Sequence, residues 1–418
     1  MRRHIFFVTY GGGHVDIVLR LLPHLENISN IKVTVLALTT AGRRIEQTGR
    51  SVRGCRHYLP RIGYEDAIAL GEALSEGLWD KTGSVPWEES CAYLGVSFAD
   101  LRAEVGSDEA SRRYQRYGRG AFCPTNFLKS LLRDEKPDIV VTTCHVRMER
   151  AAVLAAKDLG IISVRIEDLF GYSLLGTYGN GVAPQLISES EWPDEVIVLN
   201  DEVRRRVIAA GFPPAKVYSF GQPVFSDLKN EFSRTMSSSA LAALRKRFGC
   251  VVTYIAPPLR DVLKAQTDSL LKVASRNPNI GFCIKLHPSV PHGEFTAKYS
   301  VLPSNVCLLG NEDAIAVVKA SDIVLTFNST VGLFCIFQGI PLLVVDTSNV
   351  PDFMPYVSSG AARGIKRLDQ LEAAILEMLD DAPPSKPAVE FGARLFENPP
   401  GASLRISQWL ATLVHNKT

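Results

Sequence analysis

Short hydrophobic runs rich in β-branched residues alternate with amphipathic helical patterns from the start of the chain. The first run covers Ile5 to Thr9, a helical pattern follows over Val15 to Leu25, and a second run covers Lys32 to Leu38. Alternating strands and helices are typical of βαβ units, whose strands pair in parallel. The pattern therefore predicts an α/β fold built on a parallel sheet.

The alternation stops between residues 63 and 129, where the sequence becomes polar and helical without any strand-like run. We expect a helical insertion over this range. Strand patterns then return at Pro137 to Thr143, Ile161 to Ile166 and Glu195 to Leu199. Residues 1–229 are therefore predicted to form one domain that carries the insertion beside a ligand cleft.

A serine-rich segment, Asn230 to Ser239, interrupts the periodicity, and we interpret it as an interdomain linker. A second α/β set follows, with predicted strands at 250–255, 281–286, 306–309, 323–327 and 341–345 and predicted helices at 263–274, 314–320, 331–337 and 369–379. Residues 240–390 are thus predicted to form the second domain. In the remaining segment, 391–418, we expect an amphipathic helix over Leu404 to Val414 that packs back on the first domain.

The composition is that of a folded protein without a polyanionic partner. Hydrophobic residues make up 46% of the chain, charged residues 22%, and the net charge is +2. The strongest basic cluster, residues 112–119, is short. We interpret it as a solvated helix face, with an anionic-ligand or membrane-surface contact as the alternative. We therefore expect no nucleic-acid partner.

The eight cysteines lie far apart, with no C-x-x-C pair and no Cys/His cluster at zinc spacing. Free thiols are the simple interpretation, no metal is expected, and Cys283 and Cys335 lie in apolar runs where a thiol behaves as a small hydrophobe. The N-terminus has too few apolar residues for a signal peptide, and the most apolar stretch, Val331 to Val345, is shorter than a bilayer span. We expect a cytoplasmic protein and leave open peripheral contact with the inner face of the membrane.

Polar residues follow the first and fourth predicted strands of the N-terminal domain. Gly11, Gly12 and Gly13 would let a ligand approach the backbone, and His14 would begin the next helix, whose dipole favours a neutral imidazole able to act as a base. A tight turn with a capping histidine is the alternative. Glu167 and Asp168 follow the strand that ends at residue 166, and at least one of them should point into the cleft, a polar turn being the alternative.

The second domain places a different chemistry after its strands. Lys285 and His287-Pro288 combine a cation with an imidazole, which suits a phosphate. Asn328, Ser329, Thr330 and Gly332 begin a helix and are either a simple N-cap or an anion cradle. Asp346 could accept hydrogen bonds from sugar hydroxyls or cap a loop. No D-x-D pair occurs, which argues against a two-carboxylate magnesium clamp, and neither G-x-x-x-x-G-K-[ST] nor G-x-S-x-G is present.

These motifs resemble those of nucleotide-sugar enzymes with the GT-B fold. The turn from Gly11 to His14 is similar to the glycine–histidine turn of UDP-glycosyltransferases, whose histidine is commonly the base or lies near the acceptor. His287-Pro288 and Asn328-Ser329-Thr330 resemble the HP and serine-rich motifs of bacterial capsule, sialic-acid-type and glycerophosphate transferases. Asp322 to Asp346 and Gly221 to Val224 look like segments of hydrolysing UDP-N-acetylglucosamine 2-epimerases.

The resemblance implies two doubly wound Rossmann-like domains facing a central cleft, and a metal-independent glycosyltransferase without a cofactor beyond its nucleotide-sugar donor. His14, or else Asp168 or Glu167, would deprotonate an acceptor hydroxyl on a sugar, a lipid-linked molecule or a small molecule. A sugar-nucleotide epimerase or hydrolase and a non-catalytic sugar-nucleotide-binding subunit are the alternatives. Leu333 to Cys335 stand where many relatives carry a ribose-binding glutamate, so the choice between UDP and CMP- or CDP-linked donors stays open.

Overall fold

The computed structural model describes residues 2–75, 84–171, 188–226, 239–287, 290–310, 312–347, 354–380, 386–395, 398 and 400–416. The chain divides into two compact units. Unit 1 comprises Met1–Leu228 together with Phe396–Thr418, and unit 2 comprises Lys229–Leu395. The C-terminal end of the chain thus returns to the unit that contains the N-terminus.

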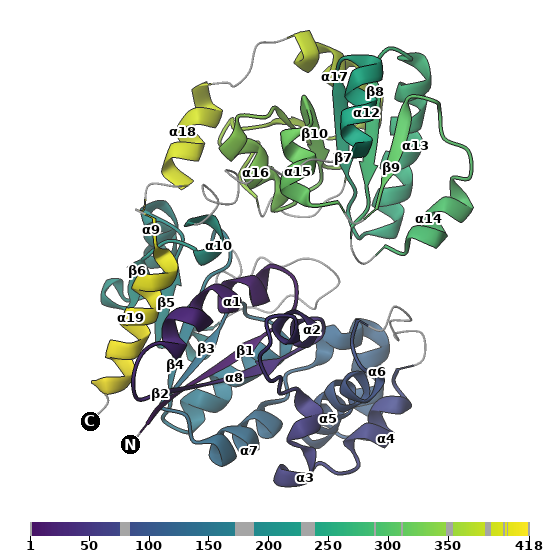
Figure 1. Cartoon of the computed structure of the whole chain (residues 1–418). Helices are drawn as coiled ribbons and strands as arrows, with labels where there is room; N and C mark the ends of the chain where they lie inside the picture. The colour runs from purple at the N-terminus through teal and green to yellow at the C-terminus, as the bar shows by residue number, and fades with distance from the viewer. Residues whose placement is uncertain are drawn as a thin grey trace. The chain divides into compact units, whose positions relative to one another are not determined.

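Unit 1 is built on a parallel sheet with the strand order β2-β1-β3-β4-β5-β6 (Figure 1). Its described strands are β1 (Arg3–Thr9), β2 (Ile31–Ala37), β3 (Ile139–Thr142), β4 (Ile162–Ile166), β5 (Glu195–Val198) and β6 (Val217–Ser219). The helices that connect or cover them are α1 (Gly13–Glu26), α2 (Ala41–Glu46), α8 (Arg147–Asp158), α9 (Asp201–Ala209), α10 (Pro223–Ser226) and α19 (Ala402–His415). The described part of residues 55–135 contains helices only, namely η1 (Cys55–His57), α3 (Leu59–Ile62), α4 (Ala67–Glu72), α5 (Trp87–Val105), α6 (Ser107–Tyr117), η2 (Gly118–Ala121) and α7 (Thr125–Glu135).

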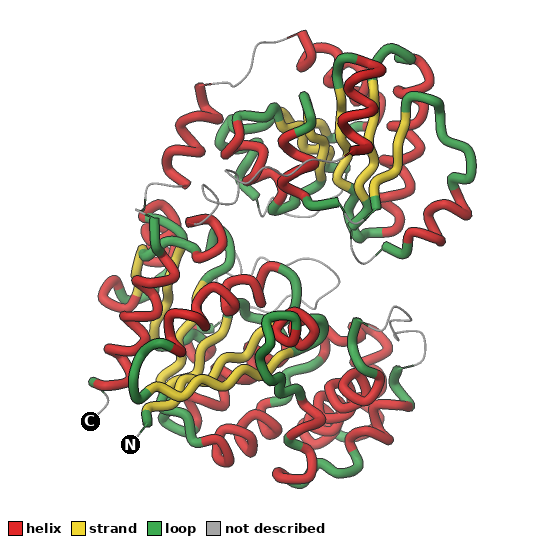
Figure 2. Tube along the Cα trace, viewed as in Figure 1, coloured by secondary structure: helices red, strands yellow, loops and turns green. Residues whose placement is uncertain are grey.

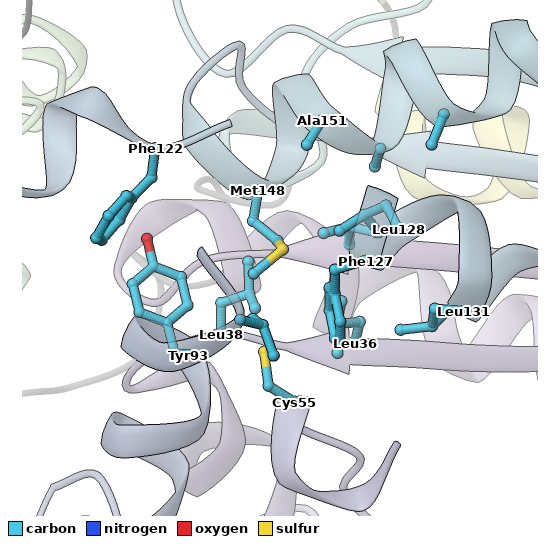
Figure 3. Close-up of a cluster of buried hydrophobic side chains, with 14 of the residues drawn as sticks. Leu36, Leu38, Cys55, Tyr93, Phe122, Phe127, Leu128, Leu131, Met148 and Ala151 are labelled. Atoms are coloured by element: carbon cyan, nitrogen blue, oxygen red, sulfur yellow. The ribbon is translucent and has the colours of Figure 1, made fainter. Parts of the chain in front are cut away.

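Both faces of this sheet are buried, and the alternation of side chains along β1 shows why. Ile5 and Phe7 join a cluster with α1 and α19, whereas Phe6 and Val8 face the insertion helices and α8. Figure 3 shows the second cluster, in which Met148 of α8 lies among side chains from β2, α5 and α7. The helical insertion therefore shares a core with the sheet.

Unit 2 repeats the plan with the strand order β12-β11-β10-β7-β8-β9, and its described strands again pair in parallel. Figure 2 shows these strands in yellow with helices in red around them. Its described strands are β7 (Val251–Ile255), β8 (Gly281–Lys285), β9 (Val306–Leu309), β10 (Ile323–Thr326), β11 (Leu342–Val345) and β12 (Arg363–Ile365). Its helices are α12 (Ser239–Phe248), α13 (Arg260–Arg276), α14 (His292–Lys298), α15 (Ala314–Lys319), α16 (Val331–Gln338), α17 (Leu371–Asp380) and α18 (Lys386–Leu395).

The predicted fold class, two doubly wound α/β domains, is confirmed by these two sheets. The sequence pattern missed the edge strands β6 and β12, and it did not assign the helices α2, α9, α10, α12, α14 and α18. Each edge strand has only three residues, too few for a visible alternation. The predicted linker falls largely on residues 227–238, which lie outside the described residues.

The helix α19 covers unit 1 at the face that carries α1. Ile406, Leu410 and Val414 are fully buried in the cluster that also holds Leu21 and Leu25 of α1. Burial of such side chains contributes about 1.5–3 kcal/mol each. Among the described helices none is long and apolar enough to cross a membrane.

Candidate functional site

The turn after β1 needs its glycines for different reasons. A Cβ on Gly11 would lie 1.8 Å from Thr40 Oγ1, so this residue is glycine because the backbone packs against Thr40. Gly12 has φ +70°, a conformation that side chains other than glycine's rarely adopt. Gly13 has neither constraint, and no described atom lies within 4 Å of its would-be Cβ. Gly12 and Gly13 are exposed, and no side chain caps α1, so this helix N-terminus stays open to a ligand.

His14 lies in the first turn of α1 and approaches the carboxylate that follows β4. Its Nδ1 is 3.7 Å from Asp168 Oδ2, and the two side chains are 25% and 14% exposed. Neither His14 Nδ1 nor Asp168 Oδ1 has a hydrogen-bond partner in the described structure. Burial raises the pKa of Asp168, and the charge of His14 opposes that rise. The structure thus brings together the imidazole and one of the two carboxylates that the sequence analysis named.

Glu167 is also at this edge, but it is more deeply buried. The residue is 1% exposed, and its backbone N–H donates to Ile197 O on β5 at 2.8 Å. The backbone carbonyl of Asp168 accepts a hydrogen bond from Gln222 Nε2 at 3.4 Å. Of the two carboxylates, Asp168 is therefore the better placed to meet a ligand at the His14 turn.

Glu149 of α8, which the sequence analysis did not name, fixes the backbone beneath this turn. Its fully buried carboxylate accepts hydrogen bonds from the N–H groups of Tyr10, Thr143 and Cys144, those from Tyr10 and Cys144 being 3.2 and 2.8 Å long. These three donors lie just after β1 and β3. Glu149 stabilises the shape of both loops and is a positioning residue rather than one that faces the open turn.

Arg165 is a second residue that the sequence analysis missed. It stands on β4 among apolar neighbours and is fully buried, and its Nη2 donates to His145 Nδ1 at 2.5 Å. Its Nε and Nη1 have no hydrogen-bond partner in the described structure. Burial lowers the pKa of Arg165, whereas the nearby carboxylates of Glu167 and Asp168 favour its charged form.

The imidazole of His145 is neutral at neutral pH. Burial, and then the charge of Arg165, lower its pKa to about 4. Because Arg165 can only donate, His145 Nδ1 must accept, which places the ring proton on Nε2, 3.5 Å from Glu191. Glu191 in turn pairs with Arg150 through contacts of 2.8 and 2.7 Å. The charged groups of Arg150, Glu191 and Arg165 and the neutral ring of His145 therefore form a continuous chain behind Asp168.

A cavity of about 200 Å³ opens at the end of β2, next to the glycine turn. Thr39 lines it and accepts a hydrogen bond from the Gly11 N–H at 3.3 Å. The cavity is also lined by Arg43 and Arg56, by His57, and by Ser84, Pro86 and Glu89 of the insertion. The insertion therefore helps to shape a cavity that adjoins the glycine turn through Thr39.

The site residues predicted in unit 2 follow β8 and β10. Lys285, Ile255 and Thr326 stand in one row across β8, β7 and β10, so Lys285 and Thr326 are about 10 Å apart along the sheet. Burial lowers the pKa of Lys285, and the charges of Glu312 and Asp313 oppose this. His287 is exposed just beyond the strand, and Pro288 lies outside the described residues.

The turn before α16 offers polar groups to the same edge. Thr326 Oγ1 and Asn328 Nδ2 are buried without a hydrogen-bond partner in the described structure, and Asn328 has φ +33°. Ser329 Oγ accepts a hydrogen bond from the Val331 N–H at 3.3 Å, and Thr330 is exposed at the N-cap of α16. The buried, unpartnered amide and hydroxyl are groups that a ligand oxygen could satisfy.

Two of the predicted residues in unit 2 have structural partners. A Cβ on Gly332 would lie 2.6 Å from the ring of Tyr356, so close packing explains this glycine. Asp346 Oδ2 accepts a hydrogen bond from Lys366 Nζ at 2.5 Å. The roles predicted for these two residues in ligand binding therefore have a competing structural explanation.

No protein-family model and no curated protein matches the sequence. Solved structures do match over the whole chain. MnaA of S. aureus, in a structure with UDP, has a TM-score of 0.62 at 15% identity over 100% of this chain and 99% of its own. The glycotransferase of kitacinnamycin has a TM-score of 0.60 at 16% identity, covering 99% and 100%. The UDP-GlcNAc 2-epimerase of Neisseria meningitidis, bound to UDP-GlcNAc, has a TM-score of 0.59 at 16% identity, covering 100% of both chains.

The chain has the GT-B fold. In an open α/β sheet, ligands bind beyond the carboxyl ends of the strands. In each GT-B domain of this protein the predicted site residues follow those ends: His14, Glu167 and Asp168 in unit 1, and Lys285, His287 and the turn before α16 in unit 2.

Two of the buried residues behind the His14 turn, Arg165 and Glu149, could have been noticed in the sequence. Arg165 interrupts an otherwise buried strand, Val164 to Ile166, and a charged residue there requires partners. Glu149 occupies the third position of α8, where a carboxylate commonly meets free N–H groups. Among the described residues, no group of three or more His, Cys, Asp or Glu side chains could hold a metal ion.

Proposed function

We propose that this GT-B protein is a glycosyltransferase that moves a sugar from a nucleotide-activated donor to an acceptor hydroxyl. The observation that carries the proposal is the pair formed by His14 and Asp168. An imidazole at an open helix N-terminus with a carboxylate 3.7 Å away is the arrangement that a general base requires.

The pair would act on the acceptor. His14 would take the proton of the attacking hydroxyl, and the carboxylate of Asp168 would stabilise the imidazolium that forms. His14 is partly exposed, so an acceptor can reach it, and the cavity at the end of β2 gives that acceptor a place beside the turn. A positioned base typically contributes ~10²–10⁴-fold to the rate.

Unit 2 would hold the donor. Lys285, the exposed His287 and the N-terminus of α16 supply positive charge and N–H donors, which suit the phosphates of a nucleotide. The unpartnered groups of Thr326 and Asn328 would gain hydrogen bonds from the same ligand. These groups would stabilise the departing phosphate without a metal ion, and nucleotide-bound GT-B neighbours support a nucleotide-sugar partner.

A sugar-nucleotide epimerase or hydrolase is the second candidate, and two observations favour it. The structural neighbours include UDP-GlcNAc 2-epimerases as well as glycosyltransferases. In addition, burial raises the pKa of Asp168, so this carboxyl keeps its proton to a higher pH and could supply an acid beside the His14 base.

A thermal-shift panel of UDP-, CMP-, GDP- and dTDP-sugars identifies the donor, because a ligand that binds only the folded protein raises its melting temperature. The donor found in this way is then incubated with the protein, first alone and then with candidate sugar, lipid-linked and small-molecule acceptors. Transfer that depends on the acceptor supports the proposal. Stoichiometric release of free, epimerised sugar without an acceptor supports the second candidate, and binding without turnover leaves a non-catalytic sugar-nucleotide-binding subunit.

A further inference from the structure

Two cysteines that lie 24 positions apart in the sequence meet in unit 2. Cys283 and Cys307 are direct register partners on the neighbouring parallel strands β8 and β9. Their sulfur atoms are 2.7 Å apart, and both thiols are free. Register partners on adjacent strands have Cα atoms about 5 Å apart, within the range of about 4.4–6.8 Å that a disulfide spans.

The two thiols differ in access. Cys283 is fully buried on β8, which has strands on both sides, whereas Cys307 is half-buried on the edge strand β9. A hydrogen bond with Cys283 lowers the pKa of Cys307, and the same contact followed by burial raises the pKa of Cys283. Cys307 is therefore the thiol that a reagent from solvent meets first and the better thiolate of the two.

The structure assigns a redox modification site to this pair: we propose that Cys283 and Cys307 form a reversible intrachain disulfide when the protein meets a low-molecular-weight disulfide. This assignment goes beyond the proposed function. Within the described residues, the contact between Cys283 and Cys307 is the thiol–thiol hydrogen bond, which makes the pair chemically distinct from the other described cysteines.

The exchange balances without any further reactant. The Cys307 thiolate attacks one sulfur of the small disulfide, forms a mixed disulfide and releases the first small thiolate. The Cys283 thiolate then attacks Cys307 Sγ and releases the second. The protein loses two protons and two electrons, and the small disulfide becomes two thiols. An excess of small thiol reverses both steps.

Peptide mapping of the whole protein tests the proposal. The reduced protein is incubated with glutathione disulfide, free thiols are alkylated, and trypsin is added. Cleavage after Arg276, Lys285, Lys298 and Lys319 leaves Cys283 in peptide 277–285 and Cys307 in peptide 299–319. We expect these two peptides to be joined, two hydrogen atoms lighter than their sum, and to separate after treatment with excess thiol.

The variant Cys307→Ser should lose the joined peptide, and Cys250→Ser, which removes another cysteine of unit 2, should keep it. Separate alkylated peptides from the oxidised wild-type protein would overturn the proposal, as would glutathione that remains attached to Cys307 without transfer to Cys283. Because the readout is a covalent mass, it does not depend on activity.

Oxidation should also change donor binding by unit 2, an expectation that rests on the proposed function. Lys285 follows Cys283 by two residues on the same face of β8 and pairs with Leu309 as Cys283 pairs with Cys307. Drawing the sulfurs to bonding distance should shift this strand end and change the donor dissociation constant at least threefold in wild type but not in Cys307→Ser. An unchanged constant overturns this coupling, whereas donor binding to neither redox form counts against the proposed function and leaves the peptide result to decide the disulfide.

Discussion

The carboxyl edges of the two sheets differ in the chemistry they present, although both sheets are six-stranded and parallel in the described structure. The edge in unit 1 gathers titratable groups, with His14 and Asp168 at the turn and Arg165 and His145 buried behind them. The edge in unit 2 presents one half-buried lysine, an exposed histidine and buried hydroxyl and amide groups. The edge in unit 1 thus has groups of the kind that act as acids and bases, and the edge in unit 2 has groups of the kind that bind anions.

Under the proposed function, the two domains would divide the work of the reaction, proton transfer in unit 1 and donor binding in unit 2. Buried ionisable groups cost free energy unless they are paired, so a protein that keeps several at one edge uses them or balances them there. In unit 2 the fully buried polar groups at this edge are neutral, and hydroxyl and amide groups can bind a phosphate without the free-energy cost of a buried charge.

Replacing His14 tests the proton-transfer role of unit 1. His14→Ala should lower the rate of sugar transfer roughly 10²- to 10⁴-fold while the donor dissociation constant stays unchanged, because the base is lost and the donor groups are not touched. Initial rates and calorimetry measure the two quantities. The matched control is His24→Ala at the other end of α1, which should keep the full rate. Full activity of His14→Ala would rule out His14 as the base and leave Asp168 or Glu167 in that role.

Replacing Lys285 tests the anion-binding role of unit 2. Lys285→Met keeps the length of the side chain but removes its charge, so the donor dissociation constant should rise roughly 10- to 100-fold, as expected for the loss of a hydrogen bond to a charged group. Calorimetric titration with the donor measures this. Lys272→Met on α13 is the control and should bind normally. If affinity is kept in Lys285→Met, the phosphate lies elsewhere.

Glycine-to-alanine variants in the two turns should differ in their free energy of unfolding. Gly11→Ala and Gly332→Ala should each destabilise the protein by about 1–3 kcal/mol, because a Cβ would collide with Thr40 in one case and with Tyr356 in the other. Gly13→Ala should leave the free energy of unfolding unchanged, since open space surrounds that position. Denaturant unfolding measures all three. An unstable Gly13→Ala variant, or stable variants at the other two positions, would contradict the packing argument.

The smallest effect concerns pH and the buried charges of unit 1. The pKa of His145 is lowered to about 4 in the folded protein from an ordinary value of 6.5. The unfolded chain therefore binds more protons as the pH falls from 6.5 toward 4, and folding stability is lost over that window. At pH 5.5 the loss should be about 1 kcal/mol relative to neutral pH. Unfolding curves at pH 7.5 and 5.5 for wild type and His145→Gln measure it, and an equal loss in both proteins would assign the effect to other groups.

Much of the fold could be predicted from the sequence because buried parallel strands are continuous hydrophobic runs. The run ending at Thr9 and the run ending at Phe327 marked their strands, and the loops after them held the candidate residues. Positions within the site could not be predicted in the same way. Gly332 and Asp346 looked like ligand groups, yet Tyr356 and Lys366, which lie 20 or more positions away in the sequence, are their partners.

The partners in the network behind the His14 turn could not be predicted from the sequence either. Arg165 lies on β4, whereas His145 and Glu149 lie four positions apart around the start of α8, and the fold brings Arg165 to His145. A single polar residue in a strand such as Arg165 indicates that partners exist but does not say which. The approach of His14 to Asp168, by contrast, was open to prediction, because both follow strands of one parallel sheet.

The return of α19 to unit 1 has a consequence for how the protein is made. Residues 402–415 supply Ile406, Leu410 and Val414 to the face of α1, and they are synthesised after all of unit 2. A ribosome that has just completed unit 2 therefore displays a first domain whose hydrophobic face is still bare. Unit 2, contiguous in sequence, can close its core during translation, whereas unit 1 must wait for the last helix. A nascent chain stalled before residue 402 should consequently be recognised by chaperones and proteases through unit 1, although that domain emerged first.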